Sequence, residues 1–357
     1  MNYNGNMIKI ARESRLLTQA ELAKMIDLSQ VVVCKIEADL YPINENLIEK
    51  IANSLSYPIE FFKNETRFLN MGVRLHRKRS TMNKREEGYI DAFISICTMC
   101  VSKLMEYVNL EVKLPEIQID EYRDAFRIAD ELRDIWDIPR GCIKNLTAYL
   151  EKNGVFIFEV DYPLQHFDAV STYNKNLQVG IIVINKNQPP DRYRFTLAHE
   201  LGHIIMHRNA FSPNLEQEAN NFASAFLMPD KDIYDNLINL NFWDLAEYKE
   251  IWQVSMASLI HRAYDLGAID KKKYISLNVR LSQLGYKKIE PACGLIKEKP
   301  SLFKDLLAYF VTNLSYSEKD LLTILNLFRE DYIKYFDLSY NNNFSPRIVN
   351  MSDYKKQ

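Results

Sequence analysis

Apolar residues recur at helical spacing through most of the first sixty positions. The runs with this spacing cover residues 8–16, 22–26, 31–36 and 47–55. Thr18 followed by Glu21 is a capping-box pattern that opens the second run, and Ser29 caps the third, which extends to Glu37. Short helices joined by a tight turn, here at Asp27, are the layout of a helix-turn-helix bundle.

The hydrophobic pattern changes twice further along the chain. Residues 64–145 look helical and connecting, whereas β-rich runs separated by turn residues occupy 155–158, 169–173 and 179–184. Helical spacing returns around residue 194 and continues to the end. We therefore predict a mainly α fold with a small α+β part whose short sheet is antiparallel or mixed. The predicted parts are 1–63 (helix-turn-helix), 64–145 (helical connector), 146–235 (the α+β part) and 236–357 (a helical C-terminal region).

Residues 199–203 read His-Glu-Leu-Gly-His and lie within an apolar helical stretch. Because His199 and His203 are four residues apart, they share one helix face and can bind one metal ion. Glu200 is placed to reach a metal-activated water, which is the general-base position of this motif. The pattern predicts a zinc hydrolase.

A catalytic zinc usually has three protein ligands, so one more is needed. The next helix, which Pro229 ends, offers Glu216 and Glu218. Glu216 shares its face with small alanines and with Asn220, whereas Glu218 shares its face with bulky aromatics. We expect Glu216 to be the third ligand, with Glu218 as the fallback. One turn from the metal, Asn220 can accept the second ring N–H of a ligating histidine.

His207 extends the histidine series by one more turn. It stands two helical turns, about 12 Å, from His199, which is too far for both to bind one ion. We interpret His207 as a helix-end residue favoured by the helix dipole.

A longer stretch carries a family resemblance. Residues 192–203, together with 216–223 and 226–229, resemble the ImmA/IrrE family of zinc-dependent metallo-endopeptidases, and the similarity extends over about residues 145–300. The resemblance implies a gluzincin-like metallopeptidase domain, zinc bound by His199, His203 and Glu216, and water activation by Glu200. It also implies a protein substrate, typically a transcriptional regulator.

Residues 6–60 resemble the XRE and phage-repressor-like helix-turn-helix family. In that family the third helix enters the major groove of DNA. Glutamine can pair with adenine, valine can touch a thymine methyl, and lysine can reach phosphate or guanine. The positions carried over as DNA contacts are Gln19, Gln30, Val31, Val32 and Lys35. Cys34 and Asp39 depart from the family pattern, because a small hydroxyl residue and a glycine are usual there.

Charge does not favour strong DNA binding by this bundle. Residues 7–60 carry eight acidic against six basic side chains, although phosphate attraction dominates DNA affinity. A basic run from Arg67 to Arg85 could supply the missing charge; as a solvated face or a junction between modules it would have no DNA role. A small bundle used for protein contacts or dimerisation is the alternative interpretation of residues 1–63.

Composition is that of a multidomain regulator. The 357 residues predict two or three domains, and the net charge of -2 implies no bulk attraction to nucleic acid or membrane. The start lacks a signal peptide and no apolar run approaches membrane-spanning length, so we expect a cytoplasmic protein without a membrane partner. Its five cysteines are expected to be reduced, and the Cys97/Cys100 pair is expected to pack in a core.

We therefore expect a zinc-dependent endopeptidase coupled to transcription, with a regulatory protein as substrate, a double-stranded DNA operator as partner and homodimer formation as a further option. A sheet edge beside the zinc helix could bind an extended peptide by strand addition. Tyr173, Tyr193 and His261 are all open as donors to the oxyanion. The alternative is a DNA-binding regulator of phage or toxin–antitoxin type whose metal site is structural or sensory.

Overall fold

The first four helices form the expected bundle in this computed structural model, which describes residues 3–65, 82–108, 110–161, 167–208, 213–291, 294–336 and 338. Thr18 and Glu21 make the capping box of the second helix, and the Ser29 hydroxyl accepts a hydrogen bond from the Val32 amide at the start of the third. The bundle consists of α1 (Gly5–Ser14), α2 (Gln19–Met25), α3 (Gln30–Glu37), α4 (Glu45–Leu55) and the 3-10 helix η1 (Ile59–Lys63).

Asp39 replaces the glycine that is usual after the third helix, and the structure shows what it does there. Its φ of 57° is in the left-handed region, which aspartate tolerates better than most residues. Its Oδ1 accepts a hydrogen bond of 2.6 Å from the Gly5 amide, at the start of α1. A Cβ atom on Gly5 would lie 2.1 Å from the Ile36 carbonyl oxygen, so only glycine allows this contact.

The three β-rich runs form one mixed sheet in the order β1-β3-β2. Strand β1 (Val155–Val160) is parallel to β3 (Val179–Asn185), and β2 (Ala169–Asn174) is antiparallel to it, with Ser171 opposite Ile182. Strands β1 and β2 are therefore the two edges.

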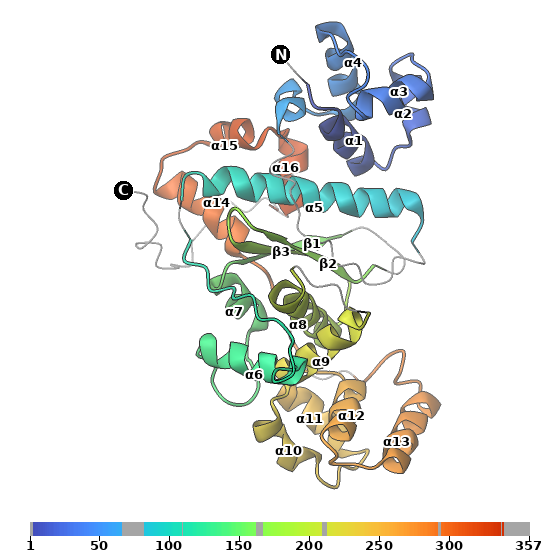
Figure 1. The fold of residues 1–357 in the computed structure, drawn as a ribbon, viewed down its shortest axis with the longest axis vertical. Helices are drawn as coiled ribbons and strands as arrows, with labels where there is room; N and C mark the ends of the chain where they lie inside the picture. The colour runs from blue at the N-terminus through green and yellow to red at the C-terminus, as the bar shows by residue number, and fades with distance from the viewer. Residues whose placement is uncertain are drawn as a thin grey trace.

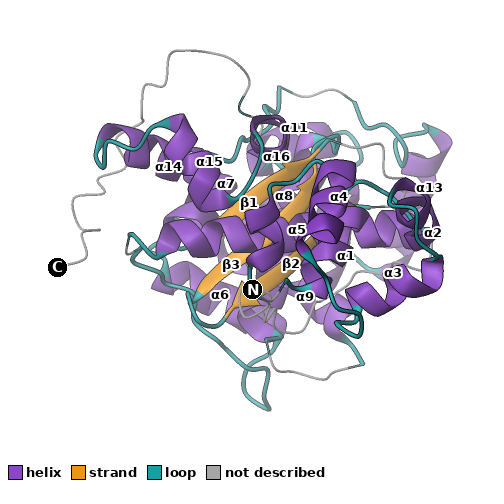
Figure 2. Ribbon diagram, turned by 90° about the horizontal axis from the view of Figure 1, so that it is seen from above, coloured by secondary structure: helices purple, strands orange, loops and turns teal. Residues whose placement is uncertain are grey.

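The sheet separates two hydrophobic cores (Figures 1 and 2). Because side chains alternate along a strand, Phe156 and Ile181 point to one core, whereas Ile157 and Ile182 point to the other. The first core also contains the helix-turn-helix bundle and four further helices: α5 (Lys84–Met105), α14 (Leu302–Thr312), α15 (Glu318–Leu325) and α16 (Arg329–Phe336).

The second core lies on the opposite face of the sheet. Helices α7 (Leu146–Lys152) and α8 (Pro190–Met206) pack on the sheet. Helix α9 (Leu215–Leu227) packs on α8, and α6 (Ala125–Ile135) packs on α9. The end of the molecule opposite the helix-turn-helix bundle in Figure 1 is formed by α10 (Asp230–Leu237), α11 (Asp244–Trp252), α12 (Met256–Asp265) and α13 (Lys271–Gln283). The mainly α class with a small mixed sheet is confirmed.

Helix α5 corrects one expectation from the sequence. It has 22 residues and a mean hydropathy of 1.3 over its most apolar window, so among the described residues it is long and apolar enough to cross a membrane. However, 89% of that window is buried inside the protein, against the bundle and the sheet. Cys97 and Cys100 are fully buried in this helix, which confirms their packing role.

The helix-turn-helix bundle is joined to the last helix by buried polar contacts. Both terminal nitrogens of Arg15 donate hydrogen bonds of 2.6 Å to the Asp331 carboxylate on α16. The Tyr57 hydroxyl lies 2.7 Å from the Tyr335 hydroxyl and 2.8 Å from Ser14 Oγ. These contacts fix the bundle on the rest of the fold.

We expect Arg15→Ala to destabilise the whole protein, because it leaves the buried Asp331 carboxylate without its cation. Breaking such a pair costs about 2–3 kcal/mol when one partner is partly exposed. Urea unfolding followed by circular dichroism measures this loss, with the exposed Lys9→Ala as control. Equal stability of the two variants would show that the contact does not hold the bundle.

Candidate metal centre

Helix α8 carries the His-Glu-Leu-Gly-His motif through the interior of the second core. It begins at Pro190, a residue suited to the first turn of a helix, and ends before His207. Arg194 and Glu298 form a buried ion pair near its start. His199, Glu200 and His203 are each at most 1% exposed. The motif is therefore held rigidly inside the protein, as the apolar sequence around it predicts.

Close contact between α8 and α9 brings the third residue of the group into place. A Cβ atom on Gly202 would lie 2.9 Å from the ring of Phe222, so the glycine lets α9 approach. Ala219 and Ala223 of α9 are fully buried. These small residues bring the first turn of α9, with Glu216, to the histidine pair.

His199, His203 and Glu216 together form a group that could hold a metal ion. The two Nε2 atoms lie 3.1 Å apart, and the Glu216 carboxylate oxygens lie 3.6 Å from His199 Nε2 and 3.5 Å from His203 Nε2. The histidines are buried, whereas the Glu216 side chain is 43% exposed. The site is therefore closed by protein on the histidine side and reaches solvent beside Glu216.

Asn220 lies where the sequence predicts it, behind the first histidine. Its Oδ1 is 2.9 Å from His199 Nδ1. If Nε2 binds a metal, the proton of the neutral ring is on Nδ1, and this N–H donates a hydrogen bond to the Asn220 amide oxygen. Such a contact fixes the tautomer and the orientation of the ligating ring.

His207 and Glu218 do the same for the second histidine, which sequence reasoning missed. His207 Nδ1 lies 2.9 Å from His203 Nδ1, and His207 Nε2 lies 2.9 Å from Glu218 Oε2. If His203 Nδ1–H donates to His207 Nδ1, the proton of the neutral His207 ring is on Nε2. This N–H then donates a hydrogen bond to the Glu218 carboxylate. Glu218, the fallback ligand, is thus linked to His203 through the His207 ring.

His207 is the residue at the C-terminal end of α8, as the sequence predicts, but its hydrogen bonds to His203 and Glu218 were not predicted. Burial, reinforced by the neighbouring His203, lowers the pKa of His207 to about 3. The lowered pKa favours the neutral ring, which can take part in the hydrogen-bond chain from His203 to Glu218. The sequence feature that could have predicted this role is the spacing of His207, which lies four residues after His203 on the same face of α8 as His199 and His203.

Ser171 is a second residue that sequence reasoning missed. It lies on the edge strand β2, is 1% exposed, and donates a hydrogen bond of 2.6 Å to Glu200 Oε2. A donor to a carboxylate favours its charged form, which is the form that accepts a proton. Because residues 171 and 200 meet only through the packing of β2 on α8, local sequence gives no sign of this pair.

The three candidates for an oxyanion donor lie in different surroundings. Tyr193 is fully buried in the second core, and Lys297 Nζ lies 4.3 Å from its ring centre. Tyr173 is half-buried beneath the Arg208 guanidinium, 3.6 Å from its ring centre. His261 lines a pocket between α9 and α12 that Asn220 also lines.

The predicted DNA contacts are divided between exposed and internal positions. Gln30, Val31 and Lys35 are exposed on α3. Val32 is half-buried and packs against the first core, and Gln19 donates a hydrogen bond of 2.8 Å to Glu37. The exposed face of α3 therefore carries the other three predicted residues together with Cys34.

Two of the six basic residues of the bundle are engaged inside the protein. Arg12 pairs with Glu37 at 2.5 Å, and Arg15 pairs with Asp331. The basic residues from Arg67 to Arg79 lie outside the described residues, whereas Arg85 pairs with Glu21 on the surface. The exposed charge of α3 itself is Lys35.

We expect Glu216→Ala to lose metal affinity by more than about 100-fold and Glu218→Ala by only about 10–100-fold, because the first removes a ligand and the second removes the support of His207. Metal content by mass spectrometry and competition with a chromogenic chelator measure both, with Lys231→Ala as control. Equal losses in the two glutamate variants would contradict the assignment.

Comparison with known protein families agrees with this geometry. Residues 150–264 match the IrrE N-terminal-like domain of a peptidase family, and residues 8–62 match the helix-turn-helix family. None of the curated proteins compared with the chain matches it. The helix-turn-helix match implies DNA binding. The chain therefore combines an XRE-type helix-turn-helix domain with an IrrE N-terminal-like peptidase domain that contains a His-His-Glu metal-binding group.

Proposed function

We propose that this protein is a zinc-dependent endopeptidase of the cytoplasm that cleaves a regulatory protein, and that its helix-turn-helix domain links cleavage to DNA. The observation that carries the proposal is the meeting of two imidazoles and one carboxylate beside a buried second carboxylate, Glu200. A sensor or a structural site has no need of such a base.

The donor atoms fit zinc. Zinc accepts imidazole nitrogen and carboxylate oxygen, and a tetrahedral site with Zn–N bonds of about 2.0–2.1 Å has ligand atoms roughly 3.4 Å apart. The separations of 3.1–3.6 Å among His199, His203 and Glu216 agree with this spacing. Structural zinc usually has four protein ligands, whereas the described residues bring three together here, which favours a catalytic site.

The proposed reaction assigns a role to each of the polar residues described above. A bound zinc ion supplies Lewis acidity toward water and the scissile carbonyl. Glu200 accepts the proton from the attacking water and delivers it to the leaving amine. Ser171 orients the Glu200 carboxylate, while Asn220 and the His207–Glu218 pair hold the two histidine rings.

The position of β2 supports an extended peptide as the substrate. It is an edge strand, packs on α8 and carries Ser171 beside Glu200. An extended peptide can add to such an edge through main-chain hydrogen bonds. A bond in that peptide would then pass close to the base and to the metal-binding group.

Glu200→Gln tests the base. We expect this variant to retain metal and to lose cleavage by about 10²–10⁴-fold, which is the usual contribution of a general base. The assay incubates the protein with the products of neighbouring genes and follows one discrete cut that a chelator abolishes. Glu247→Gln, an exposed change on α11, is the control.

The outcomes separate the two functions under consideration. Full activity of Glu200→Gln would remove Glu200 from the mechanism. A metal-loaded protein that cuts none of these proteins, yet binds DNA only when metal is present, would support the regulator with a sensory metal site.

The helix-turn-helix domain is tested with duplexes selected from a random DNA library. We expect Gln30→Ala to lower affinity for the selected sequence by about tenfold or more through a lost base contact, and Lys35→Ala to reduce the salt slope by about 1. Lys50→Ala on α4 is the control. Failure to enrich any sequence, or unchanged binding in both variants, would favour a bundle used for protein contacts.

A further inference from the structure

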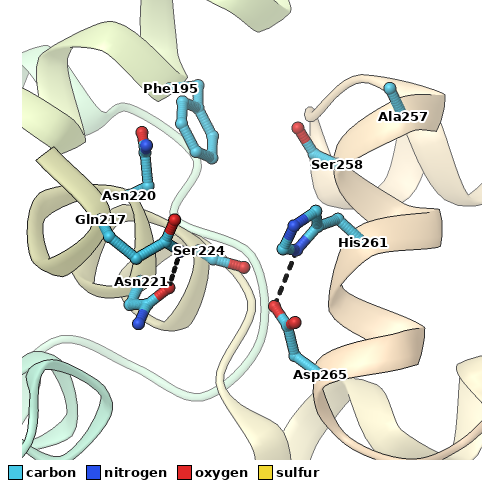
Figure 3. A pocket seen from close by; sticks show the side chains of 9 residues that line it. All are labelled: Phe195, Gln217, Asn220, Asn221, Ser224, Ala257, Ser258, His261 and Asp265. Carbon is cyan, nitrogen blue, oxygen red and sulfur yellow. Dashed lines mark hydrogen bonds and ion pairs between the residues drawn. The ribbon is translucent and has the colours of Figure 1, made fainter.

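A pocket lined mainly by polar residue types, whose exposed surface includes much of their apolar stems, separates α9 from α12 (Figure 3). Its volume is about 280 Å³, slightly below the range of about 300–1,000 Å³ that is usual for drug-sized ligands. It suits one or two residues of a peptide better than a large cofactor. Most of its lining side chains are polar, and Phe195 and Ala257 are the apolar exceptions.

The pocket begins one imidazole ring away from the metal-facing nitrogens. Asn220 lines it and also accepts the hydrogen bond of His199 Nδ1. Phe195 lines it from α8, one helical turn before His199. Since consecutive residues of an extended peptide span about 3.3–3.6 Å, a side chain one or two positions from the cleaved bond can reach this pocket.

The two walls of the pocket offer hydrogen-bond donors. His261 projects from α12 toward α9, and its Nδ1 lies 2.8 Å from Asp265 Oδ2 (Figure 3). The hydrogen bond to Asp265 raises the pKa of His261, which favours the imidazolium with a second N–H at Nε2. On the opposite wall, Gln217 donates to the Asn221 carbonyl oxygen at 2.8 Å, and the Ser224 hydroxyl points toward α12 (Figure 3).

We propose that this pocket receives one side chain of the peptide substrate and selects a side chain that ends in a carboxamide or a carboxylate. The proposal rests on the proposed peptidase function, because it assigns a subsite of the same centre. A planar oxygen acceptor can take hydrogen bonds from His261 on one wall and from the Ser224 hydroxyl on the other. An aliphatic side chain offers these donors no acceptor, so its affinity for the pocket is expected to be lower.

Binding is tested separately from cleavage. N-acetyl methylamides of glutamine, glutamate and alanine are titrated into zinc-loaded Glu200→Gln protein, and the side-chain amide signals of Gln217 and Asn221 are followed by NMR. We expect shifts with the glutamine or glutamate probe and not with alanine. The probe with the higher affinity, glutamine or glutamate, shows whether the pocket prefers a carboxamide or a carboxylate. In His261→Ala the affinity falls about tenfold, whereas the exposed Lys272→Ala on α13 binds as before.

Cleavage of a peptide library by the zinc-loaded protein is the second readout. We expect about a tenfold preference for glutamine or glutamate at one position near the cut, reduced to parity in His261→Ala. Probe binding that depends on His261, without any cleavage, would support the proposed binding pocket and contradict the proposed peptidase function. Cleavage without this preference, or amide shifts that are absent or equal for all three probes, would overturn the pocket.

Discussion

The close packing of α9 on α8 is the constraint on which the metal-binding group depends. Gly202 has no side chain where Phe222 needs room, and this contact sets the distance between the two helices. Because Glu216 and Asn220 lie one turn apart on α9, a single approach places one at the Nε2 atoms and the other at the Nδ1 atom of His199. A helix that stood farther away would remove a ligand and the support of a ligand together.

The same approach explains why two glutamates two residues apart have different partners. Glu216 points to the metal-facing nitrogens, whereas Glu218 meets His207, one turn beyond His203. The histidine face of α8 and the acidic first turn of α9 thus run alongside each other. Each buried imidazole that they share has a defined hydrogen-bond partner on its second nitrogen, which avoids the cost of an unsatisfied buried polar group.

The sheet and α5 lie between this centre and the helix-turn-helix bundle (Figure 1). Side chains of the sheet alternate between the two cores, so Ser171 faces α8 while Val170 belongs to the first core. Arg15 and Tyr57 anchor the bundle to the last helix through buried partners. Arg12 pairs with Glu37 and Arg15 with Asp331, so two of the bundle's six basic side chains are neutralised inside the protein. This limits the DNA affinity of the bundle by itself.

Local structure and the central residues of the site could be predicted from the amino-acid sequence. Helical spacing and capping patterns located α2, α3, α8 and α9, and the four-residue spacing put His199 and His203 on one face because an α-helix imposes it. Comparing the faces of α9 was enough to prefer Glu216 over Glu218. The contacts of Ser171 and His207 and the Arg15–Asp331 pair became visible in the folded chain. Those contacts join residues on different elements, and periodicity records which face a residue occupies but not which distant segment will cover it.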